Sequence, residues 1–98
     1  HDFLQSSRLV EKCIQLFISV GIYNERDVVI GREYVKLAQL YANIAHQQMN
    51  LAPSICQTYH TLARTSAAKA CEILSLLVPK GDPDLVEAEY LTKCLSNS

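Results

Sequence analysis

The apolar side chains of this chain recur every three or four residues, which is the spacing of one face of an α-helix. The first such run lies between Phe3 and Val20, and it ends at Gly21, because glycine accepts the backbone conformation that closes helices. Ile14 and Ile18 widen its apolar arc, which predicts a helix that is covered on two sides. The stripe that they widen consists of Leu9, Cys13, Leu16, Phe17 and Val20.

A second helix is predicted from Asn24, as its cap, to about Met49. Glu25 and Asp27 would lie in its first turn, where negative charge meets the positive end of the helix dipole. Gly31 interrupts this helix at a cost of about 1 kcal/mol relative to alanine, so we expect either a kink or the close approach of another backbone. The apolar stripe of this helix consists of Tyr34, Leu37, Ala38, Tyr41 and Ala45.

Asn50 and Pro53 mark the one clear internal break, with Asn50 available as a cap and Pro53 in the first turn of a long third helix. The segment 78–81 ends that helix and precedes a fourth, predicted for residues 82–95 with Asp82 as its cap. No run alternates with a period of two, so no β-strand is expected. The apolar face of the third helix consists of Tyr59, Leu62, Ala63, Ser66, Ala70, Ile73, Leu74 and Leu77.

These segments predict an all-α fold, with residues 1–98 as one domain built as an antiparallel array of about four helices. Apolar residues make up 49% of the chain and charged residues 19%, which is rich in apolar side chains for a small domain. We therefore expect a partner, or sequence outside this fragment of a longer protein, to cover some of them. The net charge of −1 favours neither a nucleic-acid partner nor a membrane anchor.

The four cysteines stand alone, with no pair spaced as in a zinc knuckle. Cys13, Cys56, Cys71 and Cys94 each fall on or near an apolar stripe, so we expect buried, reduced thiols and a cytoplasmic or nuclear location. The alternative is a secreted helical bundle linked by disulfides.

No arrangement in the sequence favours chemistry. Cys56 and His60 are four apart and His46 could join them, but a structural zinc needs a fourth ligand, and packing with a surface histidine explains the pair better. The glycines stand singly, so there is no phosphate-binding loop. We therefore predict no catalytic, cofactor-binding or metal-binding residue and no cofactor.

Two further groups have structural explanations. Capping and the helix dipole account for the acidic cluster at the start of the fourth helix. Most tyrosines are expected in the core, where their rings supply apolar area. The acidic cluster consists of Asp82, Asp84, Glu87 and Glu89, and the tyrosines are Tyr23, Tyr34, Tyr41, Tyr59 and Tyr90.

The second helix also carries four residues in the order large, leucine, small and tyrosine. Their spacing matches that in the first helix of a tetratricopeptide repeat. The small residue, Ala38, allows a paired helix to come close, and the alanine-rich segment 67–79, which ends in a proline, would supply that partner. The connection between the two is longer than in a standard repeat by about four turns, over residues 50–64.

Segments 32–43, 67–77 and 91–95 together resemble the C-terminal tetratricopeptide-like helices of SET- and MYND-domain lysine methyltransferases. The resemblance implies a parent enzyme that methylates lysine side chains with S-adenosylmethionine. It also implies that catalysis belongs to sequence outside this chain, which contains neither the SET catalytic residues nor the MYND zinc cysteines.

The candidate partner-binding face is a polar stripe on the second helix. Arg32, Gln39 and Asn43 share one side of that helix, because separations of seven and eleven residues return to the same face. One hypothesis is a non-catalytic interaction or scaffold module that binds a peptide or a neighbouring domain there. The alternative explanation of the stripe is an ordinary solvated helix face, since most polar helix faces do nothing more. The second hypothesis is a structural subdomain that packs on an absent catalytic domain.

Overall fold

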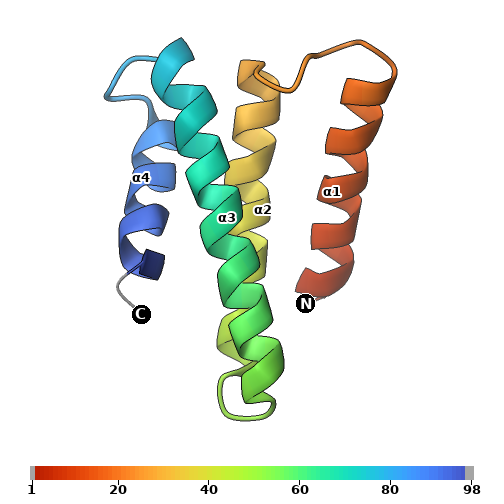
Figure 1. Cartoon of the computed structure of the whole chain (residues 1–98), viewed down its shortest axis with the longest axis vertical. Coiled ribbons are helices and arrows are strands. Elements are labelled where there is room, and N and C mark those ends of the chain that lie inside the picture. Colours follow the sequence, from red (N-terminus) through yellow and green to blue (C-terminus); the bar gives the residue numbers. More distant parts are fainter. Residues whose placement is uncertain (1, 97–98) are drawn as a thin grey trace.

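The chain is built from α-helices that run alternately up and down (Figure 1). The computed structural model describes residues 2–96, and no strand occurs among them. The prediction of an all-α array of four helices is therefore confirmed for this part of the chain. The helices are α1 (Phe3–Ser19), α2 (Val28–Gln48), α3 (Pro53–Leu77) and α4 (Pro83–Ser96).

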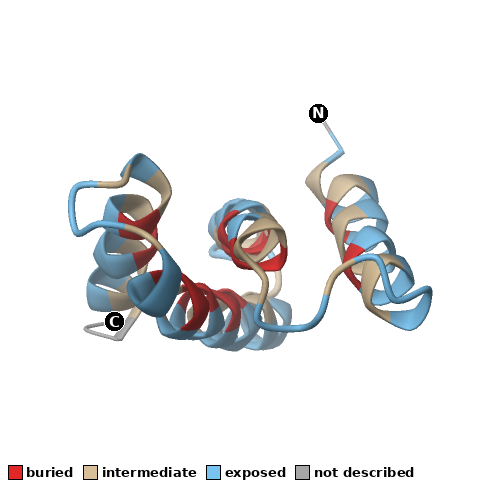
Figure 2. Ribbon diagram, turned by 90° about the horizontal axis from the view of Figure 1, so that it is seen from above, coloured by how far each residue is buried: buried red, intermediate tan, exposed pale blue. Residues whose placement is uncertain are grey.

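Helix α2 is the central element of this array. Seen from above in Figure 2, α1 and α4 lie on opposite sides of α2, and α3 lies along a third side. α3 also packs against α4, whereas α1 contacts α2 alone among the helices of residues 2–96. One side of α2 is therefore left without a covering helix.

The core lies mainly between α2 and α3, where small residues allow close packing. Ala38 on α2 and Ala63, Ala67 and Ala70 on α3 are all fully buried, so the two helices meet without bulky side chains between them. Around these alanines lie larger buried side chains, among them Ile30, Leu37, Tyr41, Ile73 and Leu74. The predicted apolar stripe of α2 is thus confirmed as its contact face with α3.

Gly31 lies in this contact, and a glycine is needed there because α3 leaves no space for a side chain. A Cβ atom built there would lie 2.9 Å from Ile73 Cγ2 and 2.9 Å from Leu74 Cδ2. α2 continues through this position as one helix. Of the two predicted alternatives, close approach is correct, but the approaching atoms belong to side chains of α3 and not to its backbone.

The helix ends differ from the prediction at two caps. Asn24 Oδ1 accepts a hydrogen bond from Arg26 N at 2.8 Å, which forms a local turn, and α2 begins only after Asp27. Asn24 is therefore not the cap of α2, because its short side chain satisfies the backbone two residues ahead. Asn50 is not a cap either, since α3 starts after Ala52 with Pro53 in the first position. Gly21 closes α1 as predicted, with φ at +77°.

Several side chains that were predicted to be buried are exposed. Leu62 is 39% exposed, and Leu77, in the last turn of α3, is 51% exposed. None of the four cysteines is fully buried, and Cys13 and Cys94 are exposed, so the prediction of buried thiols is wrong. None of the four forms a disulfide within the described residues. Most tyrosines do lie in the core as predicted, since Tyr41 is buried and Tyr23, Tyr34 and Tyr59 pack half-buried against it, whereas Tyr90 is exposed.

Helix α1 accounts for part of the remaining exposed apolar surface. Its inner side packs on α2 through Ile14, with Phe3, Val10, Phe17 and Ile18 half-buried beside it. Its other apolar positions have no covering helix, so the expected cover on two sides is present on one side only. We call these the outer stripe of α1, which consists of Leu9, Cys13, Leu16 and Val20.

Candidate partner-binding face

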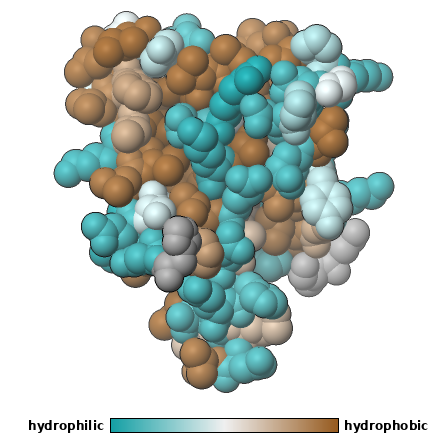
Figure 3. Space-filling model, turned by 180° about the vertical axis from the view of Figure 1, so that it is seen from behind, coloured by the Kyte–Doolittle hydropathy of each residue, from teal (hydrophilic) through white to brown (hydrophobic). Residues whose placement is uncertain are grey.

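The open side of α2 carries a continuous row of exposed polar side chains. Arg32, Gln39 and Asn43 lie in this row as predicted, and the helical spacing adds three further exposed residues to it. In Figure 3, a hydrophilic band runs down the middle of the face seen from behind, with hydrophobic side chains beside it. We call this row the α2 polar stripe, which consists of Arg32, Lys36, Gln39, Asn43, His46 and Gln47.

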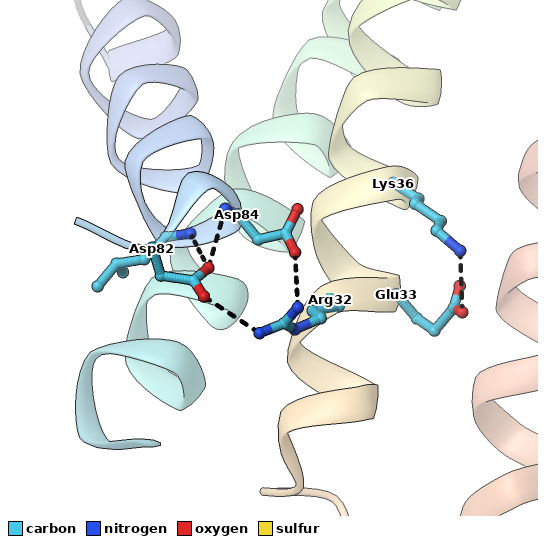
Figure 4. A network of polar contacts seen from close by, with 6 residues as sticks. Arg32, Glu33, Lys36, Asp82 and Asp84 are labelled. Carbon is cyan, nitrogen blue, oxygen red and sulfur yellow. Dashed lines mark hydrogen bonds and ion pairs between the residues drawn. The ribbon is translucent and has the colours of Figure 1, made fainter. Parts of the chain in front are cut away.

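Arg32, at the upper end of the stripe, is engaged with α4 (Figure 4). Its Nη2 lies 3.1 Å from Asp82 Oδ2, and its Nη1 lies 3.2 Å from Asp84 Oδ2. One guanidinium thus bridges two carboxylates at the start of α4, a geometry that its planar fork suits. Its side chain remains 43% exposed, so the pairs are partly screened by water.

Asp82 has two roles at this point. Its Oδ1 accepts hydrogen bonds from Asp84 N at 3.0 Å and from Leu85 N at 3.4 Å, which confirms it as the cap of α4. Its Oδ2 contacts Arg32. The carboxylate therefore starts α4 and ties that start to α2. The sequence predicted the cap but not its partner, because the two residues are 50 positions apart.

Gln39 and Asn43 occupy the middle of the stripe and differ from Arg32. Both side chains are exposed, and neither forms a hydrogen bond or an ion pair with any residue in the described part of the chain. Lys36, one turn before Gln39, pairs with Glu33 of its own helix at 3.2 Å. The two amides can each donate and accept, so they are free to pair with the backbone of another chain.

A pocket lies at the lower end of the stripe, between the start of α1 and the α2–α3 pair. It has a volume of about 400 Å³. Gln47 belongs both to the pocket and to the stripe, so the two are continuous. The rest of its lining is mostly apolar and consists of Asp2, Phe3, Leu4, Ile44, Gln48, Ile55 and Tyr59. Such a site can accept one apolar side chain.

The residues considered for metal binding are not gathered into a site. Between residues 2 and 96, no group of three or more histidine, cysteine, aspartate or glutamate side chains could hold a metal ion. His46 is exposed on α2, whereas Cys56 and His60 are half-buried on α3. His60 is not the predicted surface histidine, since both of its ring nitrogens are buried and lack a hydrogen-bond partner in the described structure.

Two general findings complete the description. None of the helices in residues 2–96 is long and apolar enough to cross a membrane. Comparison with protein families, curated proteins and solved structures found no match to this chain.

Proposed function

We propose that this chain is a non-catalytic helical module that binds another protein on the open side of α2. The observation that carries the proposal is the α2 polar stripe, in which the amides of Gln39 and Asn43 are exposed and unpaired within the described residues. The other sides of α2 are occupied by α1, α3 and α4, so this is the side on which a ligand can reach the central helix (Figure 2).

The ligand that fits this face is an extended peptide segment with one apolar side chain. Gln39 and Asn43 would pair with its backbone, since an amide side chain offers both a donor and an acceptor. The apolar side chain would enter the pocket beside Gln47, about one helical turn further along. Arg32 has a different role in this proposal, because Asp82 and Asp84 already neutralise its charge. It fixes the position of α4 beside the stripe.

The test is a selection of displayed peptides against the chain, followed by measurement of their affinities. Replacing Gln39 and Asn43 together by alanine is expected to weaken the selected peptides by roughly tenfold, the loss of one to two net hydrogen bonds. The matched control replaces Gln15 and Gln57, two exposed amides on α1 and α3. Equal affinities for the wild type and the Gln39/Asn43 variant, with unchanged helix content, would refute the proposal.

The second candidate function is a structural subdomain that packs on another domain. Exposed apolar side chains on α1 favour it, because large apolar patches on soluble domains usually mark contact surfaces. The tetratricopeptide-like character of the α2–α3 pair, the resemblance to SET- and MYND-domain methyltransferases and the cytoplasmic or nuclear location stay predictions of the sequence. If the full-length protein contains a SET domain, the structural-subdomain function is favoured over the free-standing interaction module.

A further inference from the structure

The two outermost helices of the array each expose an apolar stripe away from the core. On α1 the outer stripe keeps Leu9, Leu16 and Val20 exposed by 58%, 56% and 56%. On α4 the corresponding side chains are Val86, exposed by 49%, and Tyr90, exposed by 62%, followed one turn later by exposed Cys94. We call Val86, Tyr90 and Cys94 the outer stripe of α4. Both stripes repeat every three or four residues, as helix-packing faces do.

The charges that border the two stripes differ in net sign. Arg8 and Lys12 are exposed on α1, and neither forms an ion pair with any described residue. On α4, Glu87 and Glu89 border the stripe together with exposed Lys93, and Glu89 likewise forms no ion pair among residues 2–96. The border of α1 is therefore basic and that of α4 is mixed with a net negative charge, so the two complement each other in net sign.

The direction of the helices also matches. α1 runs upward and α4 runs downward, so an α1 placed beside α4 would continue the up-and-down order of the array (Figure 1). In that arrangement the two helices are antiparallel, as neighbouring helices already are within the chain. Antiparallel neighbours also bring opposite ends of their dipoles together.

We propose that copies of this chain associate side by side, so that the helical array continues from one copy to the next. The outer stripe of α1 in one copy packs on the outer stripe of α4 in its neighbour. Two α1 helices facing each other would bring Arg8 and Lys12 of both copies together, and two α4 helices would gather Glu87 and Glu89. The like charges oppose the pairing of two α1 helices, whereas between two α4 helices Lys93 offsets part of the repulsion. This contact uses other residues than the proposed peptide face, so the two proposals stand or fall separately.

The contact is small, which sets the expected strength of association. Each stripe offers three or four apolar side chains, fewer than the roughly 20–30 residues a side of a standard stable interface. Association should therefore be weak, and it should be open-ended, since a contact between two different surfaces does not close a dimer. The average mass is expected to rise with concentration past that of two chains.

Sedimentation of two blocked variants and of their mixture tests this association. One variant carries Leu9→Gln and Leu16→Gln on α1, and the other carries Val86→Gln and Tyr90→Gln on α4. Glutamine keeps the charge and has a helix propensity close to that of leucine, and all four positions are exposed, so folding should be retained. Far-UV circular dichroism checks it.

The expected result is that each variant alone is monomeric, while an equimolar mixture forms a dimer and nothing larger. The intact α4 of one variant then meets the intact α1 of the other, and both free ends are blocked. A wild-type chain that stays monomeric up to millimolar concentration would overturn the proposal. So would dimers of either variant alone, because they would show a symmetric contact between two copies of the same helix.

Discussion

Replacing Gly31 by alanine tests the close contact between α2 and α3. The added methyl group would lie 2.9 Å from Ile73 Cγ2 and Leu74 Cδ2 and 3.0 Å from Leu74 Cγ. Ile73 is 2% exposed and Leu74 is fully buried, so neither side chain has free space to move into. Overpacking of this kind costs about 1–3 kcal/mol, whereas alanine gains about 1 kcal/mol over glycine inside a helix. The expected net loss in free energy of unfolding is about 1 kcal/mol.

The other two glycines are matched controls for this substitution. Gly81 has nothing within 4 Å of a built Cβ and no positive φ, so Gly81→Ala should stabilise the chain by about 0.4–1 kcal/mol. Gly21 also has open space but a φ of +77°, so Gly21→Ala should destabilise it by about 1–2 kcal/mol through the backbone alone. Urea unfolding followed by circular dichroism measures all three. A Gly31→Ala variant as stable as Gly81→Ala would refute the close contact between α2 and α3.

Four further measurements address other parts of the molecule. Arg32→Ala should lower the free energy of unfolding by about 0.5–1 kcal/mol, and Asp82→Ala by about 1–2 kcal/mol, because it removes the cap of α4 as well as the ion pair. His60→Leu should raise it by about 1–2 kcal/mol, since it removes two buried nitrogens that lack partners in the described structure. Native-state hydrogen exchange should be fastest in α1, which packs on α2 alone among the described helices. Tyr90 should titrate at higher pH than an ordinary tyrosine, because a hydrogen bond with Cys94 and the negative charge of its thiolate raise the pKa of the phenol; Cys94→Ala should lower that pKa when phenolate absorbance is followed.

Each of these has a result that would contradict it. If Arg32→Ala and Asp82→Ala lowered the free energy of unfolding equally, the cap of α4 would contribute nothing to stability. A destabilised His60→Leu variant would mean that the imidazole has a polar partner. Exchange in α1 as slow as in α3 would show that α1 is held by more than its contact with α2. An unchanged titration of Tyr90 in the Cys94→Ala variant would exclude the thiol as the cause.

Helix positions were predictable because they depend on local spacing. The apolar period placed all four helices, and Gly21, Pro53 and Asp82 marked ends that the structure confirms. Asn24 does not cap α2, because the same side-chain oxygen can accept a backbone hydrogen bond either at a helix start or in a local turn. Local sequence alone does not decide between them.

Burial was harder to predict, because it depends on which helices touch. The exposure of Cys13 and Leu62, for example, depends on where the neighbouring helices lie, which local spacing does not determine. The polar stripe was visible in the sequence, since residues seven and eleven apart share a face. The ion pairs of Arg32 with Asp82 and Asp84 could not be predicted from the sequence, because they join segments that meet only after folding.

The most direct test of the proposed function is the map of amide chemical-shift changes when a selected peptide is added to the isotope-labelled chain. Binding on the open side of α2 predicts the largest changes at Gln39, Asn43 and Gln47 and at the residues that line the pocket beside them. Changes confined to the exposed side of α3, around Gln57, with an unaffected α2 polar stripe, would contradict it.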